Sequence, residues 1–262
     1  MKEETLSIRV AMVGIAAFLA SASLNAGTLD LTGGTTSGTI NSGFFIRTDA
    51  QSTGSGSINS FVRIQQSNAD VVEGYNADAR PVMPQVNTSG TFTHDVVLGS
   101  VATVNLSGLN YYEFILDINQ KNSDPLLSLD KLQIYTRGTA RGTANTLAAL
   151  SAAPSVLRYN LDAGADSEIL LDYSLNSGSG SGDMFAYIPM SVFAANTDYV
   201  YLYSQFGGKG GAYVNNDGYE EWASRTSLVV PEPGRAGAGG PRRPGGARQT
   251  PQAGGLTKLV RS

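Results

Sequence analysis

Apolar and polar residues alternate with a period of two through most of the segment 27–230. The clearest case is the run YVYLYSQF. In it, Tyr199, Tyr201 and Tyr203 would share one face of a strand and the aliphatic residues between them the other. Successive side chains of a β-strand point to opposite faces, whereas a helix would repeat its apolar positions every three or four residues. The pattern therefore predicts a protein built mainly from strands.

Several other segments show the same alternation or a short apolar run, and residues rich in Gly, Ser and Asn separate them. We expect further strands at residues 60–66, 91–99, 101–108, 111–119, 126–136, 168–175, 184–190 and 220–230. Short helices are expected only at 144–152 and 189–196, and the Gly/Ser runs at 52–57 and 177–182 are interpreted as loops within the domain. Many short strands joined by turns favour a β-sandwich, and we prefer a jelly-roll-like sandwich to a closed barrel.

The composition agrees with one exported β domain and excludes several kinds of site. Of 262 residues, 15% are charged and 31 are glycine, the net charge is −4, and there is no cysteine. Disulfides, thiolate metal sites and cysteine nucleophiles are therefore excluded. The basic residues form no cluster within the β domain, so nucleic acid, which requires a Lys/Arg patch, is not an expected partner.

The first 26 residues have the features of a secretory signal peptide. Lys2 and Arg9 precede a fifteen-residue apolar run, 10–24, and small residues then offer cleavage after Ala22 or after Ala26. A buried N-terminal helix is the alternative interpretation. The run is shorter than the roughly 20 residues of a lasting membrane anchor, so we expect export and assign residues 1–26 to the signal.

The end of the β domain carries the sequence VVPEPG, in which Pro231, Glu232 and Pro233 follow the last expected strand. Together with the segments YVYLYSQFG, NNDGYEEWA and FILDINQ, this motif resembles the bacterial PEP-CTERM proteins. The resemblance implies an exosortase as partner, a Gram-negative source, and a place at the cell surface or in an exopolysaccharide biofilm matrix. It also implies that an apolar helix and a basic cluster should follow the motif.

Residues 235–262 depart from that pattern, because they contain six basic residues, no acid and no apolar run. Read one nucleotide later with G- and C-rich codons, this stretch can encode a Gly/Leu/Ala-rich helix followed by basic residues. We therefore interpret the tail as a frameshifted anchor. A naturally disordered Gly/Pro/Arg tail remains the alternative. In either case no segment of the mature chain is expected to span a membrane.

No catalytic site is expected. His94 is the only histidine, and on a strand its neighbour Asp95 would point to the opposite face, so a catalytic triad is disfavoured and a surface histidine is expected. Glu220 and Glu221 would face opposite ways for the same reason, which leaves no pair of carboxylates to assign to a glycosidase. Two converging carboxylates in a cleft would favour a hydrolase.

Two ligand sites are open possibilities in the sequence. Calcium prefers six to eight oxygen ligands from loops rich in Asp, Asn and Glu, although such residues are also common turn formers. The candidate calcium ligands are Asp117, Asn119, Asp124, Asp217 and Glu220. The row formed by Tyr199, Tyr201 and Tyr203 could stack on sugar rings, or could instead be covered, as we expect for Trp222.

These observations lead to one prediction of function. We expect an exported, non-enzymatic surface or matrix protein with a β-sandwich at 27–230 and no required cofactor, structural calcium excepted. The alternative is a carbohydrate-binding module, which could depend on calcium. In both cases extracellular polysaccharide is the expected partner besides the exosortase.

Overall fold

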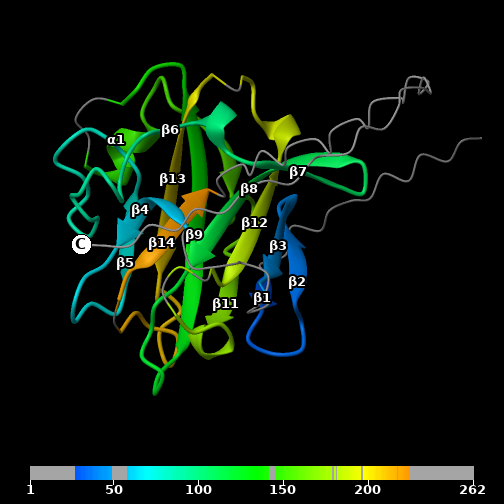
Figure 1. Ribbon diagram of the computed structural model, residues 1–262, viewed down its shortest axis with the longest axis vertical. Coiled ribbons are helices and arrows are strands. Elements are labelled where there is room, and N and C mark those ends of the chain that lie inside the picture. The colour runs from blue at the N-terminus through cyan, green and yellow to red at the C-terminus, as the bar shows by residue number, and fades with distance from the viewer. Residues whose placement is uncertain are drawn as a thin grey trace, which may run out of the picture. The chain divides into compact units, whose positions relative to one another are not determined.

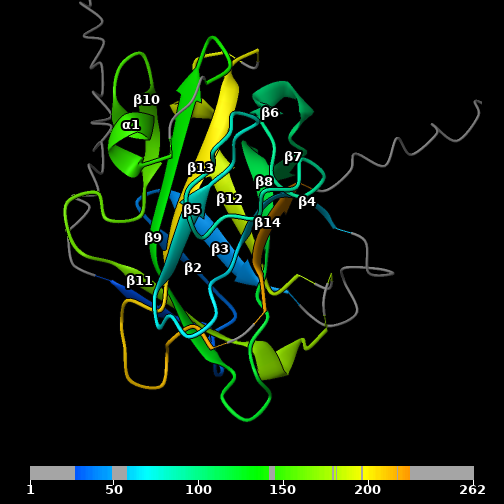
Figure 2. The same cartoon turned by 90° about the vertical axis from the view of Figure 1, so that its left-hand side faces the viewer.

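The computed structural model describes residues 27–48, 58–141, 145–178, 180, 182–195, 197–216 and 218–224. The chain divides into two compact units, Met1–Ser227 and Leu228–Ser262, and every described residue belongs to the first. The described part of the first unit is an all-β sandwich of two sheets, as the sequence predicts (Figures 1 and 2). The expected signal peptide and the Pro-Glu-Pro motif lie outside the described residues.

The first sheet has the strand order β1-β11-β9-β13-β5, with β10 beside β9 and β6 beside β13. β1 and β11 pair in parallel, whereas β9 pairs antiparallel with β10, β11 and β13. Its strands are β1 (Thr28–Asp30), β5 (Val72–Tyr75), β6 (Val96–Val97), β9 (Leu126–Arg137), β10 (Val156–Asn160), β11 (Glu168–Asp172) and β13 (Tyr199–Phe206).

The second sheet has the order β2-β3-β12-β8-β14-β4, and β7 pairs with β8. Its strands are β2 (Ser37–Ile40), β3 (Gly43–Arg47), β4 (Asn59–Ile64), β7 (Thr103–Leu106), β8 (Leu109–Asp117), β12 (Met184–Pro189) and β14 (Glu220–Ser224). In Figure 2, β9 and β11 lie on one side of the view and β8, β14 and β4 on the other.

The connections between strands repeatedly change sheet, as in a jelly roll. The chain leaves the second sheet after β8 to form β9, and it changes sheet again at each step from β11 to β12, β13 and β14. Neighbours in each sheet are therefore often distant in sequence. Thr28 of β1 is opposite Glu168 of β11, for example.

Helical structure is confined to short segments between strands. The expected helix near Leu147 is α1 (Leu147–Ser151), and the Thr146 side chain caps its N-terminus by accepting a hydrogen bond from the amide of Ala149 at 3.2 Å. The second expected helix is a single 3₁₀ turn, η3 (Met190–Val192). Two further 3₁₀ turns are η1 (Leu98–Ser100) and η2 (Tyr173–Leu175).

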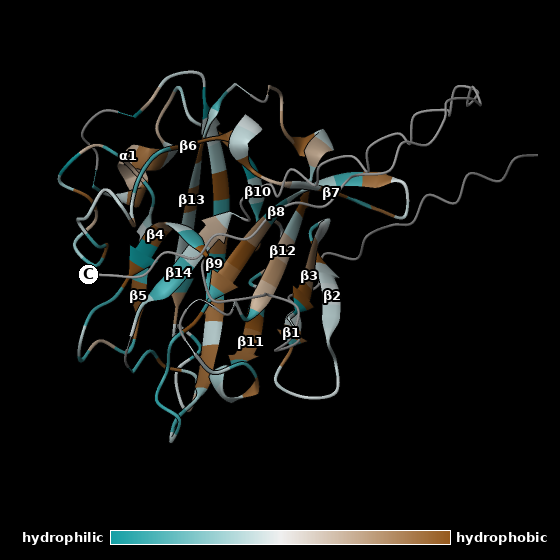
Figure 3. Cartoon of the chain, in the orientation of Figure 1, coloured by the Kyte–Doolittle hydropathy of each residue, from teal (hydrophilic) through white to brown (hydrophobic). Residues whose placement is uncertain are grey.

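The main core lies between the two sheets, and β13 shows how alternation builds it. Trp222 of β14 is fully buried, as expected, and its indole Nε1 donates a hydrogen bond across the sandwich to Ser204 Oγ at 3.0 Å. Since Ser204 faces the second sheet, Val200 and Leu202 of the same strand face it too. Figure 3 shows apolar residues concentrated along β8, β9, β11 and β12 and polar residues in many of the loops.

The outer faces of the sheets are also partly apolar. On the second sheet, Ile115, Phe185, Tyr187 and Ala223 form a separate buried cluster, in which the rings of Phe185 and Tyr187 stack with centroids 5.7 Å apart. On the first sheet, the outward-facing Tyr201 contacts Tyr75 of β5 edge to face. Alternation therefore predicts which residues share a face, but not whether that face is exposed.

Candidate functional site

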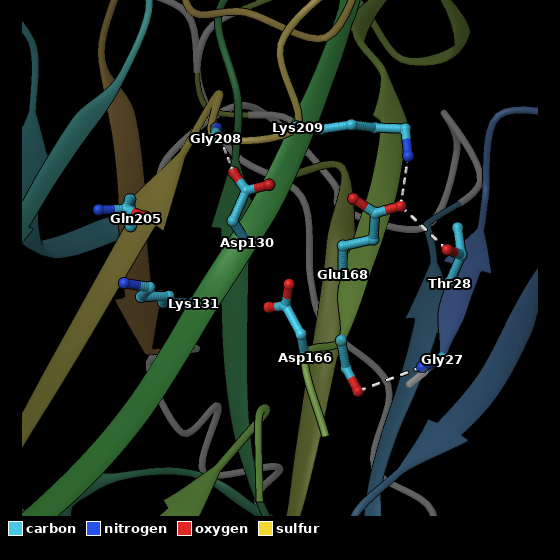
Figure 4. A pocket seen from close by; sticks show the side chains of 10 residues that line it. Gly27, Thr28, Asp130, Lys131, Asp166, Glu168, Gln205, Gly208 and Lys209 are labelled. Atoms are coloured by element: carbon cyan, nitrogen blue, oxygen red, sulfur yellow. Dashed lines mark hydrogen bonds and ion pairs between the residues drawn. The ribbon is translucent and has the colours of Figure 1, made fainter. Parts of the chain in front are cut away.

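The first sheet is hollowed where β9, β11 and β13 meet the start of β1 (Figure 4). This lysine–carboxylate hollow has a volume of about 460 Å³. It is lined by Gly27, Thr28, Asp130, Lys131, Asp166, Ser167, Glu168, Gln205, Gly208 and Lys209. Three carboxylates and two lysines therefore surround one space.

A β-bulge in β9 turns two consecutive charged residues toward the hollow. Gln205 is opposite Lys131, but the next residue of β13, Phe206, is opposite Leu129, so Asp130 is an extra residue in the ladder. Regular alternation would send Asp130 and Lys131 to opposite faces, and a bulge re-aims a side chain in this way. Regular alternation along this strand predicts no site role for Asp130, and the bulge becomes visible only when the partner strand is known.

The Asp130 carboxylate is held by Gly208, in the loop after β13, and by Ser128 of its own strand. Its Oδ2 accepts hydrogen bonds from the amide of Gly208 at 2.6 Å and from Ser128 Oγ at 2.9 Å. A Cβ at position 208 would lie 2.9 Å from Asp130 Cγ, so this close approach requires glycine. Burial raises the pKa of Asp130, and the hydrogen bonds from Gly208 and Ser128 oppose the increase only in part.

Glu168, at the start of β11, lies on the opposite side of the hollow. Its Oε1 accepts a hydrogen bond from Thr28 Oγ1 at 2.9 Å and forms an ion pair with Lys209 Nζ at 2.5 Å. The hydrogen bond to Glu168 is the main cause of the raised pKa of Lys209. Lys131 and Asp166 also line the space, as Figure 4 shows.

A second hollow adjoins the first and shares Gln205 with it. This glutamine hollow has a volume of about 450 Å³ and is lined by Gln66, Val71, Glu73, Met83, Pro84, Gln85 and Gln205. The Gln205 amide donates to Glu73 Oε2 at 2.9 Å, and the Gln85 amide donates to Gln66 Oε1 at 2.6 Å. The two hollows thus meet at Gln205 in one track, whose second half is lined by the apolar Val71, Met83 and Pro84 as well as by polar side chains. None of the residues that line either hollow was predicted as a ligand.

The predicted sugar platform of Tyr199, Tyr201 and Tyr203 is wrong. Tyr201 and Tyr203 are 0% and 1% exposed, and Tyr199 packs against the core. Their hydroxyls are engaged as well, because Tyr201 Oη accepts a bond from the amide of Arg141 at 2.7 Å and Tyr203 Oη donates to Glu73 Oε2 at 2.6 Å. Burial raises the pKa of both phenols. Neither ring offers a face to a ligand.

Two of the predicted calcium ligands, Asp117 and Glu220, belong to a buried acidic cluster that also contains Asp183. Asp117 accepts hydrogen bonds from the amides of Gly180 at 2.8 Å and Gly182 at 3.0 Å. Both glycines have positive φ, which lets two N–H groups of the expected Gly/Ser loop, two residues apart, point at one carboxylate. The described part of this loop therefore holds the buried Asp117 carboxylate in place.

The other members of the acidic cluster are also bound by N–H donors. Glu220 accepts from the amide of Asn119 at 3.2 Å and from the side chain of Gln120 at 2.7 Å. Asp183 Oδ2 accepts from the amide of Ile118 at 2.7 Å, whereas its buried Oδ1 has no partner. Burial, reinforced by the neighbouring carboxylates, raises the pKa of Asp183 and of Glu220 well above the usual range.

The remaining predicted calcium ligands are not assembled by the described residues. Asp124 is exposed in a turn, where its backbone carbonyl accepts a hydrogen bond from the side chain of Asn216 at 2.6 Å. Asn119 contributes its amide to Glu220, and Asp217 lies outside the described residues. Across the described ranges, no three or more His, Cys, Asp or Glu side chains are placed to share a metal ion.

The segment around His94 also differs from expectation. Residues 91–95 form turns and irregular backbone, and only Val96–Val97 are in a strand. His94 is half-buried, and the Asp95 carboxylate accepts a hydrogen bond from the amide of Asp78 at 3.0 Å. Glu220 and Glu221 behave as predicted, since Glu221 forms an ion pair with Arg63 while Glu220 belongs to the acidic cluster.

Comparison with known proteins identifies no relative of this chain. No family model, no curated protein and no solved structure matches the chain. Within the described ranges, every helix is too short or too polar to cross a bilayer.

Proposed function

We propose that the chain is an exported, non-enzymatic protein of the bacterial surface or extracellular matrix, and that it holds polysaccharide along the two hollows of the first sheet. The observation that carries the proposal is that Gln205 lines both the lysine–carboxylate hollow and the glutamine hollow, so that the two adjoin in one track. A linear polymer needs an extended surface of this kind, whereas a small metabolite needs only one closed pocket.

The chemistry of the track suits hydroxyl groups. Carboxylate oxygens accept hydrogen bonds, lysine ammonium groups donate them, and amide side chains do both. Asp130, Lys131 and Gln205 project from adjacent strands into one hollow, so a sugar ring could bind donors and acceptors at the same time. Each hollow lies within the range of about 300–1,000 Å³ that is typical of ligand sites.

The place of action is proposed from the two ends of the sequence. The segment 1–26 has the pattern of a secretory signal, and Pro231, Glu232 and Pro233 resemble the motif that an exosortase processes. We propose that a chain with an intact C-terminal signal is displayed or released into an exopolysaccharide matrix. Cell fractionation tests the proposed export.

Polysaccharide binding is tested with the secreted protein and three defined soluble polymers: a neutral glucan, a uronate polymer and chitosan oligosaccharides. We expect saturable binding to one of them by isothermal calorimetry, and a loss of about tenfold in affinity for Lys131→Ala, which removes one charged donor. Lys121→Ala is the matched control, since Lys121 is exposed and lines neither hollow. No binding to any polymer, or equal losses in both variants, would overturn the proposal.

A hydrolase is the second candidate, because Asp130, Asp166 and Glu168 surround one hollow and burial raises the pKa of Asp130, as a proton donor requires. The polymer that binds should then be shortened during incubation, with new reducing ends that Asp130→Asn abolishes. Binding without new reducing ends supports the non-enzymatic function.

A further inference from the structure

The first described residue, Gly27, lies on the rim of the lysine–carboxylate hollow. Its amide nitrogen is 3.4 Å from Ser167 Oγ, and its carbonyl accepts a hydrogen bond from the amide of Glu168 at 3.1 Å. Thr28 then pairs with Glu168 as the first residue of β1. The backbone of Gly27 is therefore fixed by the sheet, and its nitrogen points toward the loop before β11 (Figure 4).

That loop is acidic. The segment 160–168 contains Asp162, Asp166 and Glu168 and no basic residue. Asp162 Oδ1 accepts a hydrogen bond from the amide of Ser167 at 3.0 Å, so the loop is closed around the serine that faces Gly27. The hollow as a whole has three carboxylates and two lysines, which leaves one negative charge without a cationic counterpart among its lining side chains.

We propose that the exported chain is cut between Ala26 and Gly27, and that the new α-ammonium group of Gly27 binds in the lysine–carboxylate hollow beside Asp166 and Glu168. This inference rests on the proposed export. The cut is a hydrolysis by a signal peptidase: the oxygen of a water molecule bonds to the Ala26 carbonyl carbon, the amide bond breaks, and both protons of the water end on the nitrogen of Gly27. Ala26 leaves as a carboxylate.

The charges of the hollow distinguish the two possible cleavage positions. The sequence allows cleavage after Ala22 or after Ala26. Cleavage after Ala22 would keep residue 27 an amide with one N–H and would put the positive charge on Ser23, four residues earlier in the chain. Cleavage after Ala26 gives the nitrogen of Gly27 two further protons and a charge, which the surplus carboxylate of the hollow matches.

The first experiment determines the N-terminus of the protein secreted from the full chain, by intact mass and N-terminal sequencing. We expect Gly27. A secreted protein that begins at Ser23 would overturn the inference but leave export intact. A chain that is retained in the cell with residues 1–26 attached would instead overturn the proposed export.

The second experiment measures the ammonium group itself in protein that begins at Gly27, prepared by cutting a tag with a protease that leaves no extra residue. We expect the α-amino pKa, followed by NMR, to lie above the range of about 7.7–8.0 for a free chain end. Asp166→Asn combined with Glu168→Gln should return it to that range. Asp78→Asn, an exposed acid in another loop, is the control and should not change it.

Thermal unfolding gives an independent measure. A folded-state pKa above the unfolded one stabilises the protein at pH values below about 8, and this stabilisation disappears as the pH rises through the folded-state value. At pH 7 the Gly27 protein should therefore melt roughly 2 °C above the same protein acetylated at its N-terminus, and the difference should vanish near pH 10. Equal melting temperatures at pH 7 and an ordinary α-amino pKa would together overturn the inference.

Discussion

The acidic cluster and the lysine–carboxylate hollow each contain three carboxylates, but the two sets differ in burial and in the groups that bind them. In the acidic cluster, Asp117, Asp183 and Glu220 are at most 5% exposed and are bound by backbone and side-chain N–H groups. In the hollow, lysines stand among the carboxylates, and Asp166 is exposed to solvent. N–H donors in the interior fix a loop in one conformation, whereas charges beside water remain free to exchange partners with a ligand.

The largest expected effect comes from removing the centre of the acidic cluster. Asp117→Ala should lower the free energy of unfolding by about 3 kcal/mol, because the amides of Gly180 and Gly182 would lose a charged acceptor in a buried place. Urea denaturation measures the change. Asp166→Ala is the control from the hollow and should cost less than about 0.5 kcal/mol; similar losses in the two variants would remove the contrast between the two sites.

The second prediction has the opposite sign. Asp183→Asn should raise the free energy of unfolding by on the order of 1 kcal/mol at pH 8, because the amide keeps an oxygen for Ile118 and removes a buried charge next to Asp117. The folded-state pKa of Asp183 is raised, so wild-type stability contributed by this group is full below about pH 4 and is lost as the pH increases.

Denaturation of both proteins between pH 4 and pH 8 tests this, and the difference in the free energy of unfolding should become smaller toward pH 4.

The same measurement can be repeated with added calcium. If calcium stabilises the wild type and Asp183→Asn loses that response, the cluster binds the ion and the predicted calcium site gains Asp183 as a ligand. A variant that is less stable than the wild type at every pH would show that the carboxylate of Asp183 is needed as an anion.

The third prediction applies the same change to the hollow. Asp130→Asn should alter stability by less than about 1 kcal/mol, because an amide oxygen can still accept from Gly208 and Ser128 at this half-buried site. Binding of the polymer found by calorimetry should nevertheless weaken by about tenfold. A variant that binds normally would take Asp130 out of the ligand site.

The smallest effect is expected for Lys209→Gln. This residue is exposed, and ion pairs in water contribute little to folding. The melting temperature should equal that of the wild type within experimental error at both low and high salt. A clear loss at low salt that disappears at high salt would show that the pair with Glu168 matters for folding as well.

The sequence predicted the long strands well because each is a continuous alternating or apolar run. The boundaries of β13, Tyr199–Phe206, match the run from which it was inferred, and α1 was expected at its observed place. Strands such as β5 were missed because the sequence VEGY is short and contains Gly74, where a Cβ would lie 2.2 Å from Val86 Cγ2. Only the tertiary contact explains that glycine.

The sites were harder to predict, for physical reasons that the structure makes clear. Periodicity placed three tyrosines on one face correctly, but burial of that face depends on segments distant in sequence, including Arg141 and Tyr75. The hollow depends on a single extra residue, Asp130, whose effect on register requires the partner strand to be known. Asp183 follows a Gly/Ser run in the sequence, and nothing in that run predicts that its carboxylate lies buried near Asp117 and Glu220.

The pairing of β1 with β11 has a consequence for the order of events in folding. The hydrogen bond between Thr28 and Glu168 closes a loop of 140 residues, and the one between Ser60 and Glu221 closes a loop of 161 residues. Both sheets therefore require partners that are synthesised near the end of the domain, and chains with such distant contacts fold slowly. Neither sheet can be completed before the last of these partner strands has been made.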